Sequence, residues 1–247
     1  MVIGFLSGLF GVGGSSISTP ALRVFLHTPQ LIALGSPLPV AIPTAIVGGF
    51  IYQRAGLVHW QVVRWVVAAA VPGVIVGSLL TLWVPADWLM YLVAGTVIIV
   101  GIQLFRQAIP APTGSPDGVR ESSMWLNAPR LPVILVSLFI GLASGLLANG
   151  GGFLLVPAFV LIFGARVREA AATSLPCVAL MAVPGTATHA ALGHIDWRLA
   201  LELTVGVMPA TYLGVFLSLK FRSVRMRRPF GVFLAAFGLY FLIRELM

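Results

Sequence analysis

Two glycine-rich segments carry the residues of this chain that are best suited to chemistry. One is Gly13-Gly14-Ser15-Ser16 and the other is Asn149-Gly150-Gly151-Gly152. Glycines interrupt a helix, and a helix that restarts after them points unpaired N–H groups and a partial positive charge at the gap. Such a gap binds an anion without a charged side chain, and the hydroxyls or the amide add ligands. The alternative is that these small residues only let helices pack closely.

A second group of candidates lies in the apolar stretch 170–191. Thr173 and Ser174 could line a cavity, although hydroxyls in membrane helices commonly bond to their own backbone. His189 is a candidate ligand of substrate or of a proton, because ionisable groups are costly inside a membrane. The alternative for His189 is a hydrogen-bonded core residue. His194 and Asp196 are expected in an exterior turn, in contact with solvent.

The acidic and sulfur-containing candidates are few. Glu202 is the one acid that falls clearly within an apolar stretch, which makes it the candidate carrier of a coupled proton. Arg23 is expected to extend toward the membrane interface. Cys177 is expected to act as a small apolar residue. One cysteine and four histidines, scattered along the chain, provide no set of metal ligands, so we expect no metal and no cofactor.

The elements that position these residues occur twice. The segment 4–14 returns as 141–151, an offset of 141 − 4 = 137 residues. The matches fall on Gly, Pro, Ser and Trp, which chance similarity between apolar segments does not favour, so we infer an internal duplication. The same offset relates Pro20 to Pro157, Leu38-Pro39 to Leu175-Pro176, Gly48 to Gly185, Trp60 to Trp197 and Pro72 to Pro209.

Each copy contains four apolar stretches, and the first is broken by the glycines. The polar, proline-rich linker 108–130 separates a first repeat, 1–107, from a second, 131–247. The stretches are 1–27, 36–53, 61–84 and 88–106 in the first repeat, and 131–164, 170–191, 198–219 and 228–244 in the second.

Composition sets the class of protein. Hydrophobic residues make up 59% of the chain and charged residues 9%, with a mean hydropathy of +1.02. Soluble domains carry about 25% charged residues. This excludes a soluble enzyme, a disordered chain and a nucleic-acid-binding domain, although the net charge is +8. We therefore predict an all-α polytopic protein of the lipid bilayer.

The positive charges indicate how the chain crosses the membrane. If each broken stretch is a re-entrant hairpin, each repeat crosses about three times, the repeats are inverted and the Lys and Arg residues divide 12 against 3. If each broken stretch crosses, they divide about 8 against 7. Cytoplasmic loops are rich in Lys and Arg, so the first arrangement is favoured. It places the linker 108–130 and the loop 220–228 in the cytoplasm and both termini outside.

The glycine-rich motifs of the two copies resemble those of a known protein family. Ser7-Gly8-Leu9-Phe10-Gly11-Val12-Gly13-Gly14-Ser15 followed by Pro20 is similar to the signature of the sulfite exporter TauE/SafE family. The second copy, from Ser144-Gly145 through Gly150-Gly151-Gly152 to Pro157, resembles it again. The resemblance implies an integral membrane permease for sulfite, sulfoacetate and similar small anions. The chain departs from the pattern at Ser15 and at Ala148-Asn149.

The residues and the resemblance together predict a secondary transporter of the cell inner membrane, an exporter of small anions such as sulfite or organosulfonates. The anion is expected to bind at the two glycine-rich breaks near the membrane midplane. An uncoupled channel and a non-transporting assembly subunit are the alternatives; an enzyme is excluded because no catalytic set is present. The sequence does not identify the coupling ion. It is compatible with a homo-oligomer as well as with a monomer.

Overall fold

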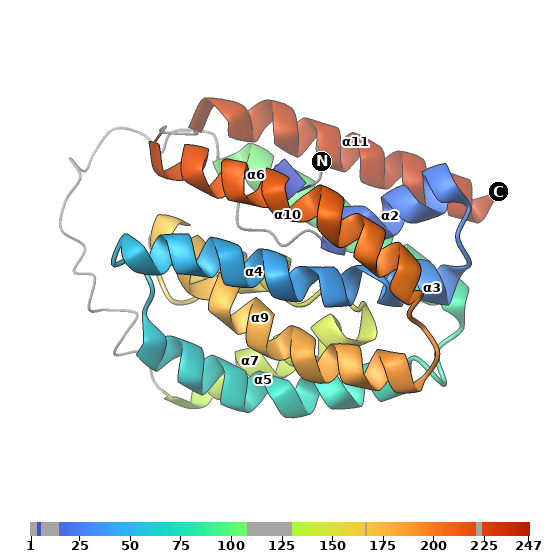
Figure 1. The fold of residues 1–247 in the computed structure, drawn as a ribbon, viewed down its shortest axis with the longest axis horizontal. Helices are drawn as coiled ribbons and strands as arrows, with labels where there is room; N and C mark the ends of the chain where they lie inside the picture. Colours follow the sequence, from blue (N-terminus) through green and yellow to red (C-terminus); the bar gives the residue numbers. More distant parts are fainter. Residues whose placement is uncertain (1–3, 6–14, 108–129, 166, 221–223) are drawn as a thin grey trace.

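The computed structural model describes residues 4–5, 15–107, 130–165, 167–220 and 224–247, and this part of the chain is helical, with no strand. The helices lie side by side along the long axis of the molecule (Figure 1). They are α2 (Ser15–Leu26), α3 (Gln30–Gly35), α4 (Pro37–Arg54), α5 (Trp60–Leu80), α6 (Ala86–Gln107), α7 (Arg130–Leu146), α8 (Gly152–Leu161), α9 (Val167–Ala191), α10 (Trp197–Lys220) and α11 (Val224–Leu246).

The predicted all-α class is confirmed, and the helix bounds follow the predicted apolar stretches closely. Five segments of the described residues are long and apolar enough to cross a membrane. The break predicted in 131–164 separates α7 from α8. The sequence did not predict α3, which ends at Gly35; Ser36 caps this end, and α4 begins directly after it at Pro37. The span candidates are Gln30–Arg54, Trp60–Leu80, Ala86–Gln103, Arg168–Ala191 and Trp197–Leu217.

Helix starts repeat with the offset seen in the sequence. Adding 137 to the first residues of α2, α3 and α5 gives the first residues of α8, α9 and α10. In the second half, α9 is continuous where the first half divides into α3 and α4. The corresponding starts are Ser15 and Gly152, Gln30 and Val167, and Trp60 and Trp197.

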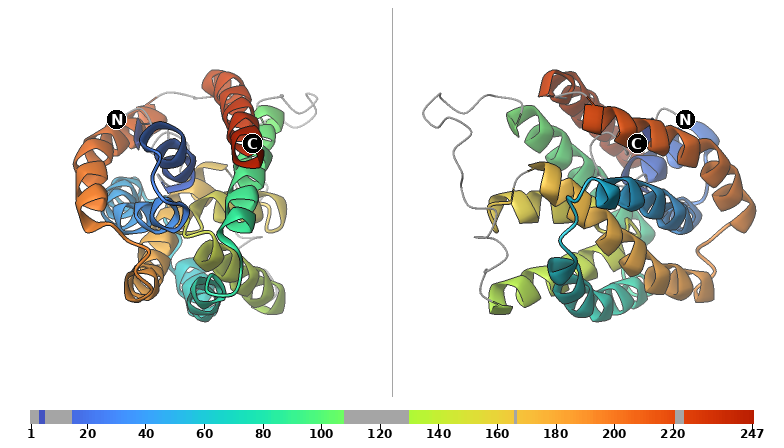
Figure 2. Two further views of the ribbon diagram at one scale, coloured as in Figure 1. Left: turned by 90° about the vertical axis from the view of Figure 1, so that its right-hand side faces the viewer. Right: turned by 60° about the vertical axis from the view of Figure 1, so that its left-hand side comes forward.

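The α4 and α9 helices form the centre of the molecule, with α5 and α7 on one side and α6 and α11 on the other (Figure 2). Their contacts are reciprocal. Gly48 of α4 lies against the side chain of Leu175, and Gly185 of α9 lies against the side chain of Leu38. These are equivalent pairs at the 137-residue offset, and they require α4 and α9 to run in opposite directions.

Small residues allow the outer helices to approach closely. The α5 and α7 helices touch backbone to backbone where Gly73 and Gly77 face Gly141 and Gly145, so that a Cβ added at any of the four would collide with the facing helix. Pairs of glycines spaced by four residues are a common contact between membrane helices. On the opposite side, Thr211 of α10 donates a hydrogen bond to the Gly4 carbonyl at 3.2 Å.

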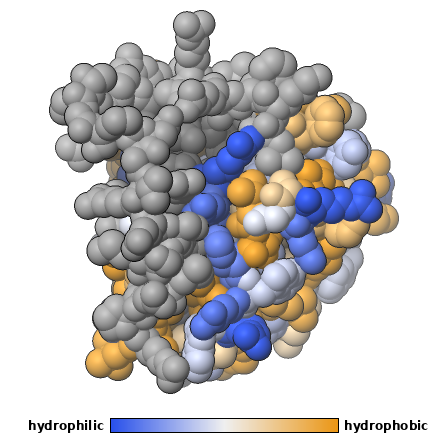
Figure 3. All heavy atoms as spheres, turned by 90° about the vertical axis from the view of Figure 1, so that its left-hand side faces the viewer, coloured by the Kyte–Doolittle hydropathy of each residue, from blue (hydrophilic) through white to orange (hydrophobic). Residues whose placement is uncertain are grey.

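The surface is apolar along the helices, and polar side chains lie at the helix ends. Large side chains such as Trp83, Phe25 and Phe139 are 82%, 71% and 68% exposed, which suits contact with lipid rather than water. Figure 3 shows hydrophilic side chains gathered on the end where α4 finishes and α5 and α9 begin. Exposed residues at that end are Gln53, Arg54, Gln61, Arg64 and Arg168.

Candidate functional site

The break between α7 and α8 is formed by residues in the left-handed backbone conformation. Gly150 and Gly151 have φ angles of 63° and 77°, and Ala148 has 48°. A side chain is strained in this region, whereas glycine adopts it freely. Gly151 is the N-cap of α8, and its carbonyl accepts the N–H of Leu155 at 3.0 Å. The glycines therefore stop one helix and start the next, as predicted.

The break is buried at mid-depth of the central helices. Gly150 lies against Val178 and Ala41, and Gly151 lies against Met181 and Ser144. Val178 and Met181 flank the middle of the span candidate Arg168–Ala191. The α7–α8 break therefore lies halfway along α9; its position near the membrane midplane stays a prediction.

The N-terminus of α8 provides the electrostatics of the break. The N–H groups of the first turn of a helix lack acceptors within the helix, and they carry a partial positive charge. Asn149 is fully buried beside them, and its backbone N–H donates to the Ser144 carbonyl at 3.2 Å. The N–H groups at the start of α8 therefore form a buried group of donors of the kind that can bind a small anion.

Of the glycine-rich break in the first half, only the C-terminal side, from Ser15 onward, lies among the described residues. The helix α2 begins at Ser15, 137 residues before Gly152, and Ser16 follows in the same turn. Gly13 and Gly14 lie outside the described residues, so their role as anion ligands stays a prediction, as does that of the Ser15 and Ser16 side chains.

Thr173 joins two helices rather than facing the break. Its hydroxyl accepts a hydrogen bond from the backbone N–H of His59 at 3.3 Å. The Ser36 hydroxyl accepts one from the N–H of Asp196 at 3.0 Å. These pairs correspond, because 36 + 137 = 173 and 59 + 137 = 196. Each hydroxyl therefore holds a loop that precedes a span in the other half of the chain, and substrate binding by Thr173 stays a prediction.

Ser174 and His189 lie at opposite parts of α9. The Ser174 hydroxyl donates to the Ala171 carbonyl at 3.0 Å. His189 is fully buried and lies fifteen residues further along, about 22 Å at 1.5 Å per residue. One small anion cannot contact both side chains while α9 stays straight, so the two do not form a single site.

His189 lies beside the end of α7 and forms a pair with His194. Its Nε2 is 2.9 Å from the Gly145 carbonyl, and its Nδ1 is 3.2 Å from Nδ1 of His194. The expectation that His194 contacts solvent is wrong, since His194 is only 6% exposed. Its loop is covered because Gly35 packs on the His194 backbone. The sequence signal was two histidines on either side of the Gly193 turn.

Glu202 lies apart from the break. It forms an exposed ion pair with Arg198 of the preceding turn, with Nε to Oε1 at 3.2 Å and side chains 63% and 90% exposed. Surface pairs of this kind contribute little to stability. A role for Glu202 in proton coupling stays a prediction, and the described contacts do not connect it to the anion-binding groups.

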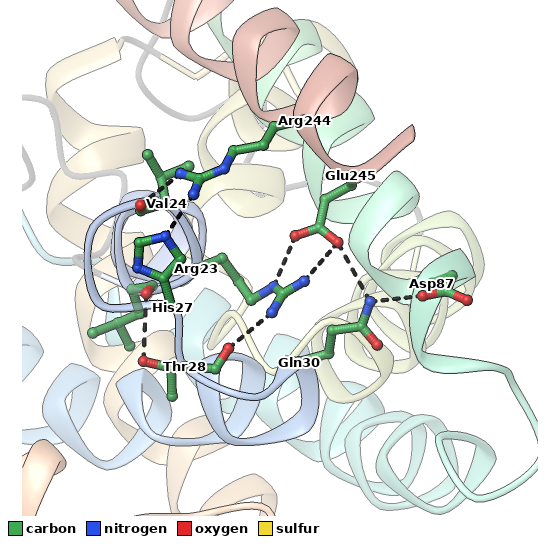
Figure 4. A network of polar contacts seen from close by, with 9 residues as sticks. Arg23, Val24, His27, Thr28, Gln30, Asp87, Arg244 and Glu245 are labelled. Atoms are coloured by element: carbon green, nitrogen blue, oxygen red, sulfur yellow. Dashed lines mark hydrogen bonds and ion pairs between the residues drawn. The ribbon is translucent and has the colours of Figure 1, made fainter. Parts of the chain in front are cut away.

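An ion pair that was not predicted from sequence joins Arg23 to Glu245 (Figure 4). Arg23 donates through Nε at 2.7 Å and Nη2 at 2.9 Å to the two Glu245 oxygens, and through Nη1 at 3.0 Å to the Thr28 carbonyl. Gln30 connects Glu245 to Asp87. Arg23 therefore holds α11 and α6 to the end of α2 instead of extending freely toward the interface.

A largely apolar pocket of about 240 Å³ lies between α4 and α9, and its lining includes none of the residues that contact Gly150 and Gly151. Gln53 and Trp60 carry the only side-chain polar groups of this lining. Among the described residues, no three His, Cys, Asp or Glu side chains are grouped to hold a metal ion. The pocket residues are Ala45, Ile46, Gly49, Phe50, Gln53, Trp60, Pro176, Ala179 and Leu180.

A helical molecule with an apolar outer surface and a helix break buried at mid-span has the features of an integral membrane transporter. The sequence profile described as "Sulfite exporter TauE/SafE" matches residues 1–241. The chain belongs to this family. The resemblance noted from the sequence motifs is thereby confirmed.

Known proteins of similar sequence carry the same general description. A "Probable membrane transporter protein" of Xylella fastidiosa (strain 9a5c) is 28% identical, over 99% of this chain and 92% of its own length. The "Probable membrane transporter protein YdhB" of Bacillus subtilis (strain 168) is 24% identical, over 86% and 85%. No solved structure matches the chain. The chain is therefore a membrane transporter of this family.

Proposed function

We propose that the protein is a secondary transporter that exports small anions, such as sulfite or organosulfonates, across the cell inner membrane. The observation that carries this proposal is the buried N-terminus of α8, placed halfway along α9 and preceded by Gly150 and Gly151. The anion would bind the N–H groups of this helix start, with Asn149 and Ser144 as neighbours.

The residues around the α7–α8 break favour an anion that is bound by the backbone N–H dipoles of α8. The residues that contact Gly150 and Gly151 are apolar or neutral, so the partial positive charge of the helix start is the main electrostatic feature. A low local dielectric strengthens hydrogen bonds to a charged acceptor. A cation would meet the wrong sign of charge at this position. The side chains around the two glycines are Leu38, Ala41, Ser144, Val178 and Met181.

The α7–break–α8 segment fits a re-entrant hairpin. Gly141 lies against Ala70 and Gly145 against Val74, so α7 runs in the same direction as α5. The contact of Thr173 with His59 and that of Gly185 with Val74 give α9 this direction too. The chain enters α7 and α9 from the same end of the molecule, so it turns back between these two helices. The α8 helix, with 10 residues, is also too short to cross a membrane alone.

Inverted repeats would follow from the same contacts. The equivalent helices α4 and α9 are antiparallel, so the axis relating the two halves is perpendicular to them. If these helices cross the membrane, the axis lies in its plane, as in transporters with alternating access. Arg54 ends α4, and Arg64 and Arg168 lie near the starts of α5 and α9. These helix ends share one end of the molecule (Figure 1), and we assign that end to the cytoplasm.

Flux through proteoliposomes tests the proposal directly. Wild-type protein should move labelled sulfite or 2-hydroxyethanesulfonate, and Gly151→Val should abolish this flux because a branched side chain strains the left-handed backbone and contacts Ser144 and Met181. The matched control is Gly206→Val on α10, where an added Cβ has open space. Equal flux in both inserted variants, or no flux of any tested anion in wild type, would contradict the proposal.

The same assay separates the two alternative activities. A channel or facilitator would carry the anion at a rate that does not depend on an imposed proton gradient. An assembly subunit would give no flux but would co-purify with a partner. The direction of net transport is tested by loading the anion on one side only, in vesicles of known protein orientation.

A further inference from the structure

A pair of buried histidines lies between the α7–α8 break and the loop that joins α9 to α10. The two Nδ1 atoms are 3.2 Å apart, and the rings are 5.4 Å apart at an angle of 46°. His189 is fully buried and His194 is 6% exposed. His194 is therefore the member of the pair nearer to solvent, and His189 is the member nearer to the break.

The contacts fix where the hydrogens must be. A carbonyl oxygen only accepts hydrogen bonds, so the Nε2 of His189 carries a hydrogen that it donates to Gly145. In neutral His189 the Nδ1 is then an acceptor, and His194 donates to it from its own Nδ1. Neutral His194 consequently has a bare Nε2, which can accept a proton.

The inner end of this chain of contacts reaches the break. The Gly145 carbonyl that receives His189 also accepts the N–H of Ala148 at 3.3 Å, and Asn149 is the next residue. Helix C-termini are stabilised by a nearby cation. A proton on His189 would therefore lie at the end of α7 and close to the anion-binding start of α8.

Charged side chains near the pair already have partners. Asp196 accepts the N–H groups of Arg198 and Leu199 at the start of α10, and Arg198 forms its ion pair with Glu202. The helix α3, whose Gly35 touches the His194 backbone, has no charged residue. The other ionisable side chains of α5, α7 and α9 lie further along their helices: Arg64, Arg130, Arg168, Glu169 and Cys177.

We propose that His189 and His194 form a proton-binding pair whose protonation strengthens anion binding at the α7–α8 break. This inference rests on the proposed function and names its coupling residues. It assigns to the pair the role for which Glu202 was the candidate from sequence.

The transfer moves one proton and no electrons. The proton binds Nε2 of His194, and the hydrogen on Nδ1 of His194 passes to Nδ1 of His189. His194 is then neutral with its hydrogen on Nε2, and His189 carries one positive charge with hydrogens on both nitrogens. The reverse steps release the proton to the side from which it came. Proton binding and anion binding therefore favour each other.

The expected coupling is large enough to measure. The 2.9 Å contact and the four-residue step from Gly145 to Asn149 place the charge roughly 9 Å from the break. At an effective dielectric constant of about 20, a unit charge at that distance changes anion affinity by on the order of tenfold. By linkage, the bound anion raises the proton affinity of the pair by the same factor.

Binding of 2-hydroxyethanesulfonate to protein in nanodiscs tests the pair, because this sulfonate stays ionised over the whole range in which histidines take up protons. Burial lowers the pKa of His194 from its ordinary 6.5, so we expect wild-type affinity to rise on the order of tenfold as the pH falls well below that value. His189→Gln and His194→Gln should bind with little dependence on pH. The controls His59→Gln and Glu202→Gln should behave as wild type. A wild-type pH dependence retained in both pair variants would overturn the inference.

A second measurement uses the wild-type protein without any added anion. In ¹⁵N-histidine NMR spectra of the wild-type protein, the two Nδ1 signals should titrate together, because they share one hydrogen. Independent titration of His189 and His194, or no protonation of the pair, would overturn the pair even if transport is observed. Absence of any anion binding with a shared titration would instead contradict the proposed function and leave the proton site in place.

Discussion

At the residue scale, the candidate site depends on backbone groups more than on side chains. Gly150 and Gly151 adopt a conformation that starts α8 in a buried position, and this start supplies the donors. The side chains named from sequence divide into two kinds. Asn149 lies at the break, and His189 lies beside the end of α7. Thr173 and Ser174 hydrogen-bond to backbone groups elsewhere.

Asn149→Ala should weaken anion binding by about 1.5–3 kcal/mol, because the lost hydrogen bond has a charged acceptor. The matched control is Thr204→Ala on α10, whose hydroxyl donates to the Ala200 carbonyl within its own helix. Calorimetry on both purified variants measures the affinity, and melting temperatures show that each is folded. A loss of stability in Asn149→Ala with wild-type affinity would assign the amide to packing.

Acid should destabilise the folded protein through His194. Burial lowers the pKa of His194 from its ordinary 6.5, so the unfolded chain takes up a proton at a pH where the folded chain does not. The free energy of unfolding therefore falls as the pH falls below about 6.5. The melting temperature in detergent should drop over this range, and His194→Gln should reduce the drop. An equal drop in both proteins would contradict the argument.

At the element scale, helices that are distant in sequence are joined by two kinds of contact. Glycines permit α5 and α7 to touch backbone to backbone. At the ends of α2, α6 and α11, polar side chains make the connection, centred on Arg23 and Glu245. Arg244 extends this network by donating to the Val24 carbonyl at 2.6 Å. This network of charged side chains lies where α2 ends and α6 begins.

Glu245→Gln should lower the free energy of unfolding by about 1.5–3 kcal/mol, because Arg23 loses a charged acceptor in a pair whose side chains are 23% and 9% exposed. The matched control is Glu202→Gln, which removes an exposed pair and should change stability little. Thermal unfolding in one detergent compares the two. Equal effects of the two substitutions would mean that the Arg23–Glu245 pair is not a structural connection.

At the scale of the whole molecule, local signals were predictable from sequence and distant contacts were not. Hydropathy, Gly and Pro are read within a short window, so the helix bounds and the α7–α8 break followed from them. Arg23 and Glu245 are 222 positions apart, and no local pattern relates them. The burial of His194 likewise depends on the packing of Gly35 from the other half of the chain.

The orientation of the whole molecule in the membrane is open to a labelling test. Inverted repeats with a cytoplasmic linker require the end that carries Arg54, Arg64 and Arg168 to face the cytoplasm and the end that carries Arg198 to face outward. The native Cys177 is fully buried, so a membrane-impermeant maleimide should report only introduced cysteines. In intact cells it should label Arg198→Cys, whose position is 90% exposed.

Arg64→Cys and Ser115→Cys should react only after the membrane is opened, the first because its helix begins at the cytoplasmic end and the second because it lies in the linker. Unlabelled Cys177 in the parent chain is the background control. Labelling of Ser115→Cys from outside would reverse the orientation. Labelling of Arg64→Cys and Arg198→Cys from the same side would be incompatible with α5 and α10 as spans related by inversion, because these residues lie near the starts of equivalent helices.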